Sequence, residues 1–310
     1  MRAVVQWSFG GPEVLEVGEV DRPAPGQGDV LVRVHAASVN PIDCAARAGQ
    51  LLNTTAAVLP RTIGRDVSGV VEQVGDGPSR FCPGDEVFGM LDEREGGYAE
   101  YVAVPSGLLA GKPVRLSHLE AAGLPLAGLT AWQMLTETAH LQAGRGVLVH
   151  AAAGGVGHLA VQLAKTLGAY GLATARADKH ALLRSLGVDE PIDYTTIDFA
   201  EAARDVDVVL NLVGGPYIRR SAAVLRRGGL LITVRSAGYE SDLAEAARQG
   251  VRTARFLVRP DAGGLAHLAE LAEVGRLRVV HSVLPLDQAA EAHIRLEGGH
   301  TTGKLVLAIA

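Results

Sequence analysis

The segment from Ala151 to Gly157 has the residue types and spacing of a phosphate-binding turn. It contains three alanines and three glycines, and it lies between a strand-like apolar run, Val147–His150, and residues with helical spacing. Such a backbone approaches a pyrophosphate closely, and the N–H groups at the start of the helix then face the negative charge. The spacing, Ala-x-x-Gly-x-x-Gly, is close to the dinucleotide fingerprint. The predicted contacts are Ala153, Gly154, Gly155, Val156 and Gly157. The alternative is a turn that only permits close packing of the strand against the helix.

The type of dinucleotide is predicted from the end of the second strand, Gly171–Ala175. An acidic side chain there would bind the ribose hydroxyls of NAD, whereas cations suit the 2′-phosphate of NADP. Arg176 and Lys179 fall at this end, close to Thr174, and we therefore predict that the cofactor is NADPH. Solvated loop charges are the alternative for the two cations. If the strand runs further, Asp178 would instead bind the ribose and select NADH.

Composition limits the class of protein. The chain has 310 residues, of which 48% are hydrophobic and 20% charged, enough for two domains with sizeable cores. Its formal net charge of −5 gives no support for nucleic acid or anionic membranes as partners. The sequence has no signal-peptide pattern or membrane-spanning run, and Cys44 and Cys82 do not make a disulfide framework. We therefore expect a cytoplasmic protein.

The sequence has two regions with different patterns of residue types. Residues 1–110 hold short valine-rich runs separated by Gly and Pro, which predicts a barrel-like β domain without a helix of convincing length. A capping box at Ser117–Glu120 then begins a helical region that includes Leu129–Leu141. Beyond it, strands alternate with helices as in an open parallel sheet. The strands are Val147–His150, Gly171–Ala175, Val206–Val213 and Leu230–Val234, and the helices include Gly157–Leu167, Lys179–Leu186 and Tyr217–Leu225.

The tail after Phe256–Val258 is predicted to form a helix, a strand, a second helix and a final strand. These elements are Leu265–Val274, Val279–Leu284, Pro285–Leu296 and Gly303–Ile309. Periodicity alone leaves open whether the tail extends the nucleotide-binding sheet or returns to the first domain.

Several motifs together resemble the quinone oxidoreductase/zeta-crystallin group of the medium-chain dehydrogenase/reductase superfamily. The most specific runs from Gly144 to Lys165 and contains the run Ala-Ala-Gly-Gly-Val-Gly that ends at Gly157. The other motifs are Gly11–Leu15, Ser38–Asp43, Gly64–Val71, Pro83–Gly89, Gly96–Val102, Ala127–Trp132 and His300–Lys304. They cover nearly the whole chain and are specific for the subgroup, but much less so for the substrate.

The resemblance implies an α/β protein with two kinds of domain. A GroES-like β-barrel-type catalytic domain would occupy residues 1–120, and a Rossmann doubly wound parallel-sheet domain that binds NADP would occupy residues 121–262. Residues 263–310 would return to the catalytic domain, with the active site in the cleft between the domains. Members are often homodimers, and Phe256–Val258 would be suited to pair across a two-fold axis.

Further cofactor contacts come from matched family positions. Thr130 matches a threonine on the helix between the domains, Tyr194 a tyrosine near the adenosine phosphate, and Val213 a residue lining the nicotinamide ribose. Gly303 and Lys304 match a C-terminal pair that closes on the cofactor. The alternatives for Thr130, Tyr194 and Lys304 are a polar residue on a helix face, a half-buried tyrosine and a solvent-exposed lysine.

Zinc is not predicted, although alcohol dehydrogenases of this superfamily use it as a Lewis acid. A catalytic zinc needs thiolate and imidazole ligands. Cys44 is close to the place of a ligand cysteine, but Gly64-Arg65-Asp66 stands where a Gly-His-Glu would be required. The sequence also lacks the four clustered cysteines of a structural site. We predict no metal and interpret Cys44 as a small apolar side chain.

Without a metal, the substrate must already be activated toward hydride, as quinones and α,β-unsaturated carbonyls are. Asn40 and Asp43 match family positions at the cleft and are the predicted catalytic residues, with turn chemistry as the alternative for both. Relatives often carry tyrosine or lysine two residues after the aspartate, where this chain has Ala45. Water or another residue, such as Arg47 or Tyr98, would then protonate the product.

The sequence thus predicts a zinc-independent, NADPH-dependent reductase of a quinone, an enone or an enal. Because Ala45 replaces a polar residue, a second hypothesis stays open, a cofactor-binding protein without redox turnover such as a sensor or a non-redox cyclase. A third hypothesis is a reductase that uses NADH, and it depends on Asp178.

Overall fold

The computed structural model describes residues 1–51, 58–92, 96–234 and 239–309, and the chain divides into two compact units. Unit 1 consists of Met1–Leu129, Pro260–Gly275 and Val279–Ala310, and unit 2 of Thr130–Arg259 and Arg276–Arg278. Helix α3, Pro125–Gln133, carries the chain from the first unit into the second. Within the described ranges, every helix is too short or too polar to cross a membrane.

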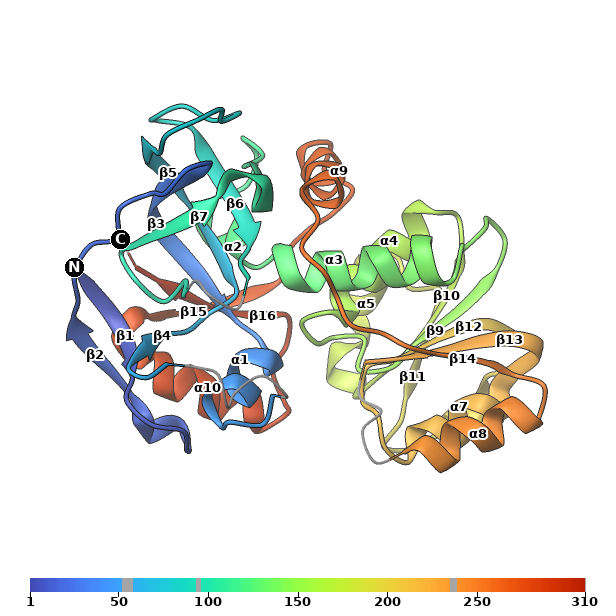
Figure 1. Ribbon diagram of the computed structural model, residues 1–310. Helices are drawn as coiled ribbons and strands as arrows, with labels where there is room; N and C mark the ends of the chain where they lie inside the picture. The colour runs from blue at the N-terminus through green and yellow to red at the C-terminus, as the bar shows by residue number, and fades with distance from the viewer. Residues whose placement is uncertain (52–57, 93–95, 235–238, 310) are drawn as a thin grey trace. The chain divides into compact units, whose positions relative to one another are not determined.

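Unit 2 is built on a six-stranded sheet in the order β11-β10-β9-β12-β13-β14, and all its neighbouring strands are parallel. Helices α7 and α8 cover one face of the sheet and α4 lies on the other (Figure 1). The strands, in chain order from β9 to β14, are Gly146–Val149, Tyr170–Ala175, Glu190–Asp193, Val206–Asn211, Leu225–Thr233 and Arg252–Arg255. Helices α4 to α8 are Gly157–Thr166, His180–Ser185, Phe199–Ala202, Tyr217–Val224 and Glu240–Arg248.

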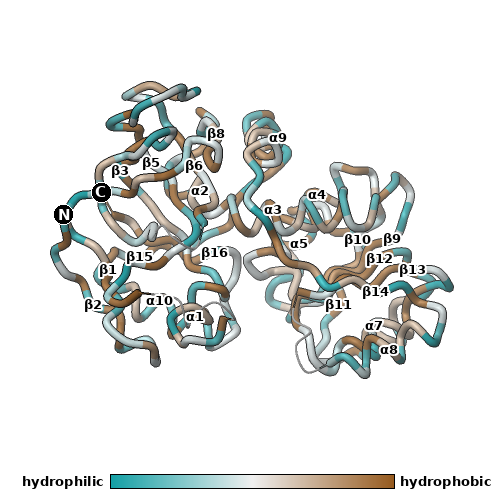
Figure 2. The backbone as a smooth tube through the Cα atoms, in the orientation of Figure 1, coloured by the Kyte–Doolittle hydropathy of each residue, from teal (hydrophilic) through white to brown (hydrophobic). Residues whose placement is uncertain are grey.

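The central strands of this sheet are apolar because helices cover them on both faces. Leu148, Val209 and Leu231 are completely buried, and they share a cluster with Ile218 of α7 and Leu243 of α8. The brown colour of these strands in Figure 2 marks the same apolar layer. The predicted parallel sheet with helices on both faces is therefore present. The four predicted strands and three predicted helices occur in the expected order, and the structure adds β11 and α6 between them.

Several boundaries in unit 2 differ from the prediction. The predicted strand Val206–Val213 ends at Asn211, and helix Leu129–Leu141 is divided into α3 and a π-helical segment, Met134–Thr138. The edge strand β14, Arg252–Arg255, which lies just before Phe256–Val258, was not predicted. Its arginines explain the difference, because charged residues on an edge strand hide the apolar pattern of a sheet. The edge strand β11, Glu190–Asp193, was not predicted for a similar reason.

Unit 1 contains a seven-stranded sheet in the order β15-β16-β3-β5-β6-β8, with β7 also paired to β3, and a three-stranded sheet in the order β2-β1-β4. The strands β1 to β8 are Arg2–Gln6, Leu15–Glu19, Asp29–Val39, Arg61–Thr62, Asp66–Val74, Glu86–Met90, Tyr101–Pro105 and Leu109–Gly111. The tail adds α9, Ala262–Glu273, β15, His281–Pro285, α10, Ala289–Glu297, and β16, Lys304–Ala308. Because β16 pairs antiparallel with β3, the end of the chain belongs to the sheet of unit 1.

The first 110 residues do contain a helix, contrary to the prediction. Helix α1, Pro41–Arg47, begins after Asn40, whose backbone N–H donates to the carboxylate of Asp43 at 2.8 Å. Proline at the first helical position is already set for helical φ, and an acid in the first turn suits the helix dipole. The same Asn-Pro-x-Asp spacing that suggests a turn is thus a helix start. The predicted capping box at Ser117 is confirmed, and it begins α2, His118–Ala122.

Gly303 illustrates a backbone that admits no side chain. Its φ is +64°, and a Cβ atom on it would overlap the carbonyl oxygen of Val280. Gly299, in the same connection between α10 and β16, has a φ of +75° but open space around its Cβ position. The two glycines therefore share the conformational requirement and differ in the steric one.

We expect Gly303→Ala to destabilise the protein more than Gly299→Ala does. The positive φ alone costs about 1–2 kcal/mol in each variant, and overpacking adds about 1–3 kcal/mol only at Gly303. Urea unfolding of both variants measures the difference in the free energy of unfolding. Equal losses in the two variants would show that the backbone at Gly303 relaxes freely.

Candidate active site

The predicted dinucleotide turn follows β9 at the carboxyl end of the sheet in unit 2. Helix α4 begins at Gly157, and its N-cap residue Val156 has no side-chain acceptor for the first N–H groups. A Cβ atom on Gly157 would overlap the carbonyl oxygen of Ala151 and the backbone of Ala152, so close packing requires glycine there. Glycine at this position therefore serves the close packing of the turn and is also compatible with phosphate binding. Because these helix N–H groups have no capping side chain, the cradle fits an anion.

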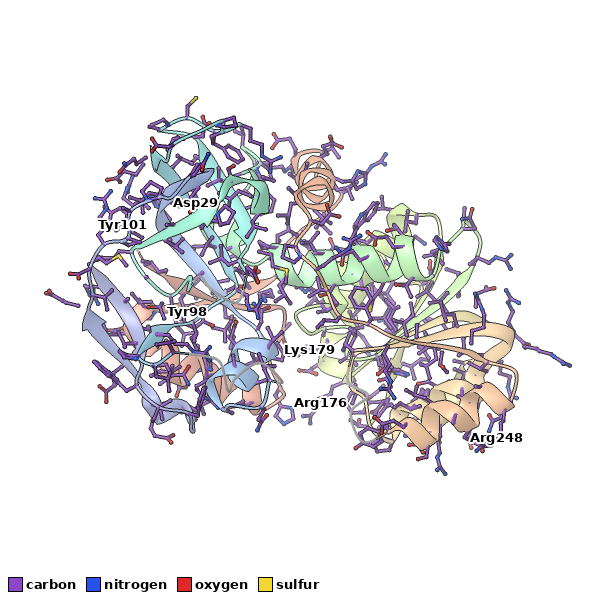
Figure 3. All side chains as sticks on the ribbon, in the orientation of Figure 1. Asp29, Tyr98, Tyr101, Arg176, Lys179 and Arg248 are labelled. Atoms are coloured by element: carbon purple, nitrogen blue, oxygen red, sulfur yellow. The ribbon has the colours of Figure 1, made fainter. Side chains whose placement is uncertain are left out.

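The predicted cations follow the neighbouring strand. Strand β10 ends at Ala175, and Asp178 lies beyond it in a short helical turn, Ala177–Lys179. Lys179 pairs with Asp178 at 2.9 Å, whereas the guanidinium of the exposed Arg176 makes no hydrogen bond or ion pair with the part of the chain that the structure describes. Figure 3 shows Arg176 and Lys179 in this loop of unit 2. Asp178 is thus off the strand, although the NADH alternative needs it at the strand end. Tyr194 follows β11, the next strand of the sheet, and is 42% exposed.

The hydroxyl of Thr174 is used inside unit 2. It lies 3.0 Å from Nδ1 of His150, while Nε2 of His150 lies 2.9 Å from the hydroxyl of Ser221 on α7. All three side chains are buried. Burial, and then the positive charge of Arg220, lowers the pKa of His150 to about 3. His150 is therefore a neutral bridge between β9, β10 and α7 directly before the glycine turn.

The turn after β12 is stabilised by a side chain that the sequence prediction did not name. Oδ1 of Asn211 accepts hydrogen bonds from the N–H groups of Val213 at 3.1 Å and Gly214 at 2.9 Å. The predicted contact of Val213 with the nicotinamide ribose therefore cannot use this N–H unless the bond breaks. Thr130, on α3, is buried at 5% exposure.

Within unit 1, four polar side chains from different elements meet away from water. Asp66, the first residue of β5, accepts hydrogen bonds from the side chains of Ser38 at 2.7 Å and Asn40 at 2.9 Å, and from the N–H of Leu126 at 2.9 Å. Lys304 of β16 donates to Oδ1 of Asn40, and its Nζ lies 3.7 Å from Asp66. Asn40, Asp66 and Lys304 are each at most 3% exposed. We refer to Ser38, Asn40, Asp66 and Lys304 as the Asp66 cluster.

The cluster combines two opposed electrostatic effects. Burial raises the pKa of Asp66 and lowers the pKa of Lys304, and their mutual attraction opposes both shifts. Burial, and then the charge of Asp66, raises the pKa of the nearby Asp43 to about 7. The positive charge of Lys304 thus favours the ionised form of the buried Asp66, against the effect of burial.

The two side chains considered as proton donors also have partners within unit 1. Arg47 donates to Glu297 at 2.7 Å and to Nδ1 of His293 at 3.2 Å, so the neutral imidazole carries its proton on Nε2. That atom lies 3.4 Å from the hydroxyl of Tyr98, which donates to Asp43 at 3.2 Å. Tyr98, labelled in Figure 3, is completely buried. The hydrogen bonds therefore run in one direction, from Arg47 to Asp43.

The two residues at the positions considered for zinc ligands, Cys44 and Asp66, have properties that do not suit zinc binding. Burial raises the pKa of the Cys44 thiol to about 12, so the side chain stays protonated and apolar. Asp66 already accepts three hydrogen bonds, as described above. Among the described residues, the structure brings together no three His, Cys, Asp or Glu side chains that could hold a metal ion.

The sequence-predicted residues therefore fall into two groups. Asn40, Asp43 and Lys304 come together in unit 1, and the glycine turn, Arg176 and Lys179 follow adjacent strands in unit 2. Sequence reasoning missed Ser38, Asp66, His150 and Asn211 as organising residues. Their only signal was a polar side chain within or at the end of an apolar strand, as in Asp66–Val74.

Two family models match the chain. The one described as "Alcohol dehydrogenase GroES-like domain" matches residues 26–114, and the one described as "Zinc-binding dehydrogenase" matches residues 186–307. The quinone oxidoreductase of Pongo abelii is 32% identical over 323 residues, covering 99% of this chain and 97% of the relative. The chloroplastic NADPH-dependent alkenal/one oxidoreductase of Arabidopsis thaliana is 35% identical over 322 residues, covering 99% of this chain and 79% of the relative.

Solved structures agree over the same length. The structure of the quinone oxidoreductase from Coxiella burnetii is similar with a TM-score of 0.94 and 36% sequence identity. The match covers 100% of this chain and 99% of that chain. Both units therefore have counterparts in one known protein.

Acidification should destabilise the protein through His150. In the unfolded chain the imidazole has its ordinary pKa of about 6.5 and binds a proton, whereas in the folded chain it stays neutral down to pH about 3. Its contribution to the free energy of unfolding is complete above pH about 6.5 and falls by about 2 kcal/mol between pH 7.5 and pH 5. Urea unfolding at both pH values checks this. The difference between wild type and His150→Gln should shrink toward pH 5, and a constant difference would contradict the assignment.

Lys304→Met should cost about 3–5 kcal/mol of folding stability, because Asp66 would remain buried without its cation. The double variant Lys304→Met/Asp66→Asn should lose less than the sum of the single variants, with a coupling of about 1–3 kcal/mol. Lys165→Met is the matched control. Lys165 pairs with Asp189 at 2.7 Å but is 48% exposed, so its loss should cost under about 1 kcal/mol. Additive losses at Lys304 and Asp66 would disprove the interaction.

Proposed function

We propose that this chain, which belongs to the quinone oxidoreductase/zeta-crystallin-like subgroup of the medium-chain dehydrogenase/reductase superfamily, is a zinc-independent reductase that uses NADPH. It would transfer a hydride to a quinone or to an α,β-unsaturated carbonyl. The predicted family and the predicted combination of a GroES-like domain with a Rossmann-type sheet are confirmed. Relatives at 32% and 35% identity are named for quinone and alkenal/one reduction, which supports this substrate class.

One observation carries the cofactor assignment. The turn of mostly small residues after β9 lies beside the loop after β10, where the guanidinium of Arg176 has no hydrogen-bond or ion-pair partner among the described residues. A pyrophosphate on the turn would place the adenosine half along β10, where Arg176 and Lys179 suit a 2′-phosphate. The predicted contacts Ala153, Gly154, Gly155, Val156, Thr174 and Tyr194 belong to the same site in this proposal.

When bound, NADPH supplies the hydride for a conjugated carbon of the substrate. The residues of the chain supply position and charge. The Asp66 cluster ties the start of α1 to β3, β5 and β16, and so fixes the segment from Asn40 to Arg47 that we propose to face the substrate. Gly303 and Lys304 lie at the start of β16, the strand that pairs with β3 in this sheet. We propose that Asn40 and Asp43 act in catalysis as residues that orient their neighbours.

Proton delivery is assigned to water. Ala45 has no proton to give, and a guanidinium such as Arg47 stays protonated throughout the working pH range. Tyr98 is completely buried and donates to Asp43, and burial raises its pKa. A hydroquinone or enolate oxygen needs only a donor of ordinary strength, which water provides.

Three further proposals concern organisation. We assign residues 1–120 to catalysis, residues 121–262 to NADP binding and residues 263–310 to the catalytic domain. We propose a homodimer, because β14 is the last strand of its sheet among the described residues and Phe256–Val258 follow it directly. Sedimentation equilibrium tests the oligomeric state.

The two cysteines are free thiols, which supports a cytoplasmic location that fractionation of the cells would test.

The two rival hypotheses have specific supports. Binding without turnover, as in a sensor or a non-redox cyclase, is favoured by Ala45. Use of NADH is favoured by Asp178, which is exposed in the turn after β10 and paired with Lys179. The position of Asp178 beyond the strand end makes NADPH the better-supported cofactor.

The decisive experiment mixes the protein with NADPH and a panel of quinones, enals and enones, and follows nicotinamide absorbance. We expect oxidation of NADPH that persists after dialysis against a zinc chelator.

Arg176→Ala should weaken NADPH binding about tenfold and NADH binding by much less, because only NADPH carries the 2′-phosphate. Arg184→Ala, on the exposed part of α5, is the control. Tight binding without turnover would favour the sensor hypothesis, and equal losses for both cofactors would refute the assignment of Arg176.

A further inference from the structure

Asn211 ends β12 with a buried hydrogen-bond donor that has no partner among the described residues. The residue is 0% exposed, and its Nδ2 atom is the unsatisfied one. Buried amide groups in folded proteins normally have hydrogen-bond partners, because desolvation of an unpaired donor is unfavourable. This donor therefore calls for an acceptor that the described chain does not provide.

The orientation of the amide is fixed by its neighbours. Oδ1 accepts from the N–H groups of both Val213 and Gly214, and both of these are donors. Exchanging the oxygen and nitrogen atoms of the amide would place donor against donor, so Nδ2 must point away from the turn. An aspartate in this position would cap the turn equally well. The turn itself thus does not require the amide nitrogen.

The sheet order locates this donor relative to the proposed cofactor. The glycine turn follows β9, the cationic loop follows β10 on one side of it, and Asn211 ends β12 on the other side. A dinucleotide with its pyrophosphate on the turn extends in both directions along the carboxyl edge. Because the adenosine half is assigned to β10, the nicotinamide half lies toward β12.

We propose that Nδ2 of Asn211 donates a hydrogen bond to an acceptor oxygen in the nicotinamide half of the bound dinucleotide. This inference rests on the proposed use of NADPH. The donor is covered in the ligand-free chain, so the turn after β12 has to move for the contact to form. Gly214 and Gly215, with φ of +80° and +56°, give this turn a backbone that can do so. Asn211 is thus a binding residue that also holds the turn next to the cofactor.

Asn211→Asp is the sharpest variant, since it retains an oxygen for Val213 and Gly214 and replaces only the donor. We expect its affinity for NADP⁺ in calorimetric titrations to fall at least about tenfold, ~1.4 kcal/mol. Binding of 2′,5′-ADP, which lacks the nicotinamide half, should change by less than about twofold. Gln249→Glu, exposed in the same unit, controls for the added negative charge. Equal weakening of both ligands, or NADP⁺ affinity like that of wild type, would overturn the inference.

A measurement on the wild-type protein covers the case in which the variant does not fold. The side-chain NH₂ resonances of Asn211, assigned through its own carbon correlations, should shift on addition of NADP⁺ and stay in place with 2′,5′-ADP. Backbone amides of Ala151 to Gly157 should shift with both ligands. If these amides shift and the Asn211 resonances do not, the inference fails while the cofactor assignment stands. If neither responds to NADP⁺, both fail.

Discussion

The buried carboxylate of Asp66 connects the elements on which unit 1 depends. It accepts hydrogen bonds from β3, from the residue directly before α1 and from the backbone of α3, and it faces the lysine that begins β16. A charge without water must be matched by donors and a counter-charge, or folding becomes unfavourable. The requirement therefore fixes where four elements from distant parts of the chain meet. It also fixes the start of α1, which carries the proposed substrate-facing segment.

In unit 2, by contrast, the buried polar side chains that connect the elements are neutral, so they need hydrogen-bond partners but no counter-charge. His150 bridges Thr174 and Ser221 immediately before the glycine turn, and burial keeps it unprotonated. Gly157 then allows the first turn of α4 to lie against the end of β9 without a steric overlap. Together they hold the helix N-terminus at the sheet edge without a side-chain cap from Val156. Rigid backbone donors of this kind suit a phosphate better than mobile side chains would.

The same division appears in the use of glycines and amides. Gly303 is required because a neighbouring carbonyl occupies its Cβ position, and Gly214 because its backbone has positive φ. The side-chain oxygen of Asn211 accepts hydrogen bonds from the turn after β12, and its Nδ2 atom has no partner among the described residues. In the active site we propose, fixed backbone and a few buried polar groups bind the cofactor. Substrate choice then depends on the short helix α1, where Ala45 removes the polar side chain that relatives often carry.

The sequence by itself determined the parallel sheet of unit 2, the glycine turn and the absence of the Gly-His-Glu triplet, because each is a local pattern of residue types. It also placed Arg176 and Lys179 close to a strand end, and the structure puts them directly after it. It did not determine α1, whose Asn-Pro-x-Asp start is equally a turn, or the edge strands β11 and β14, whose charges mask the apolar period. Only tertiary structure decided the roles of Asp66, Lys304, His150 and Asn211. The partners of Asp66, Lys304 and His150 lie tens or hundreds of residues away, and Asn211 contributes through its burial. The strength of each interaction comes from the exclusion of water, which no local pattern records.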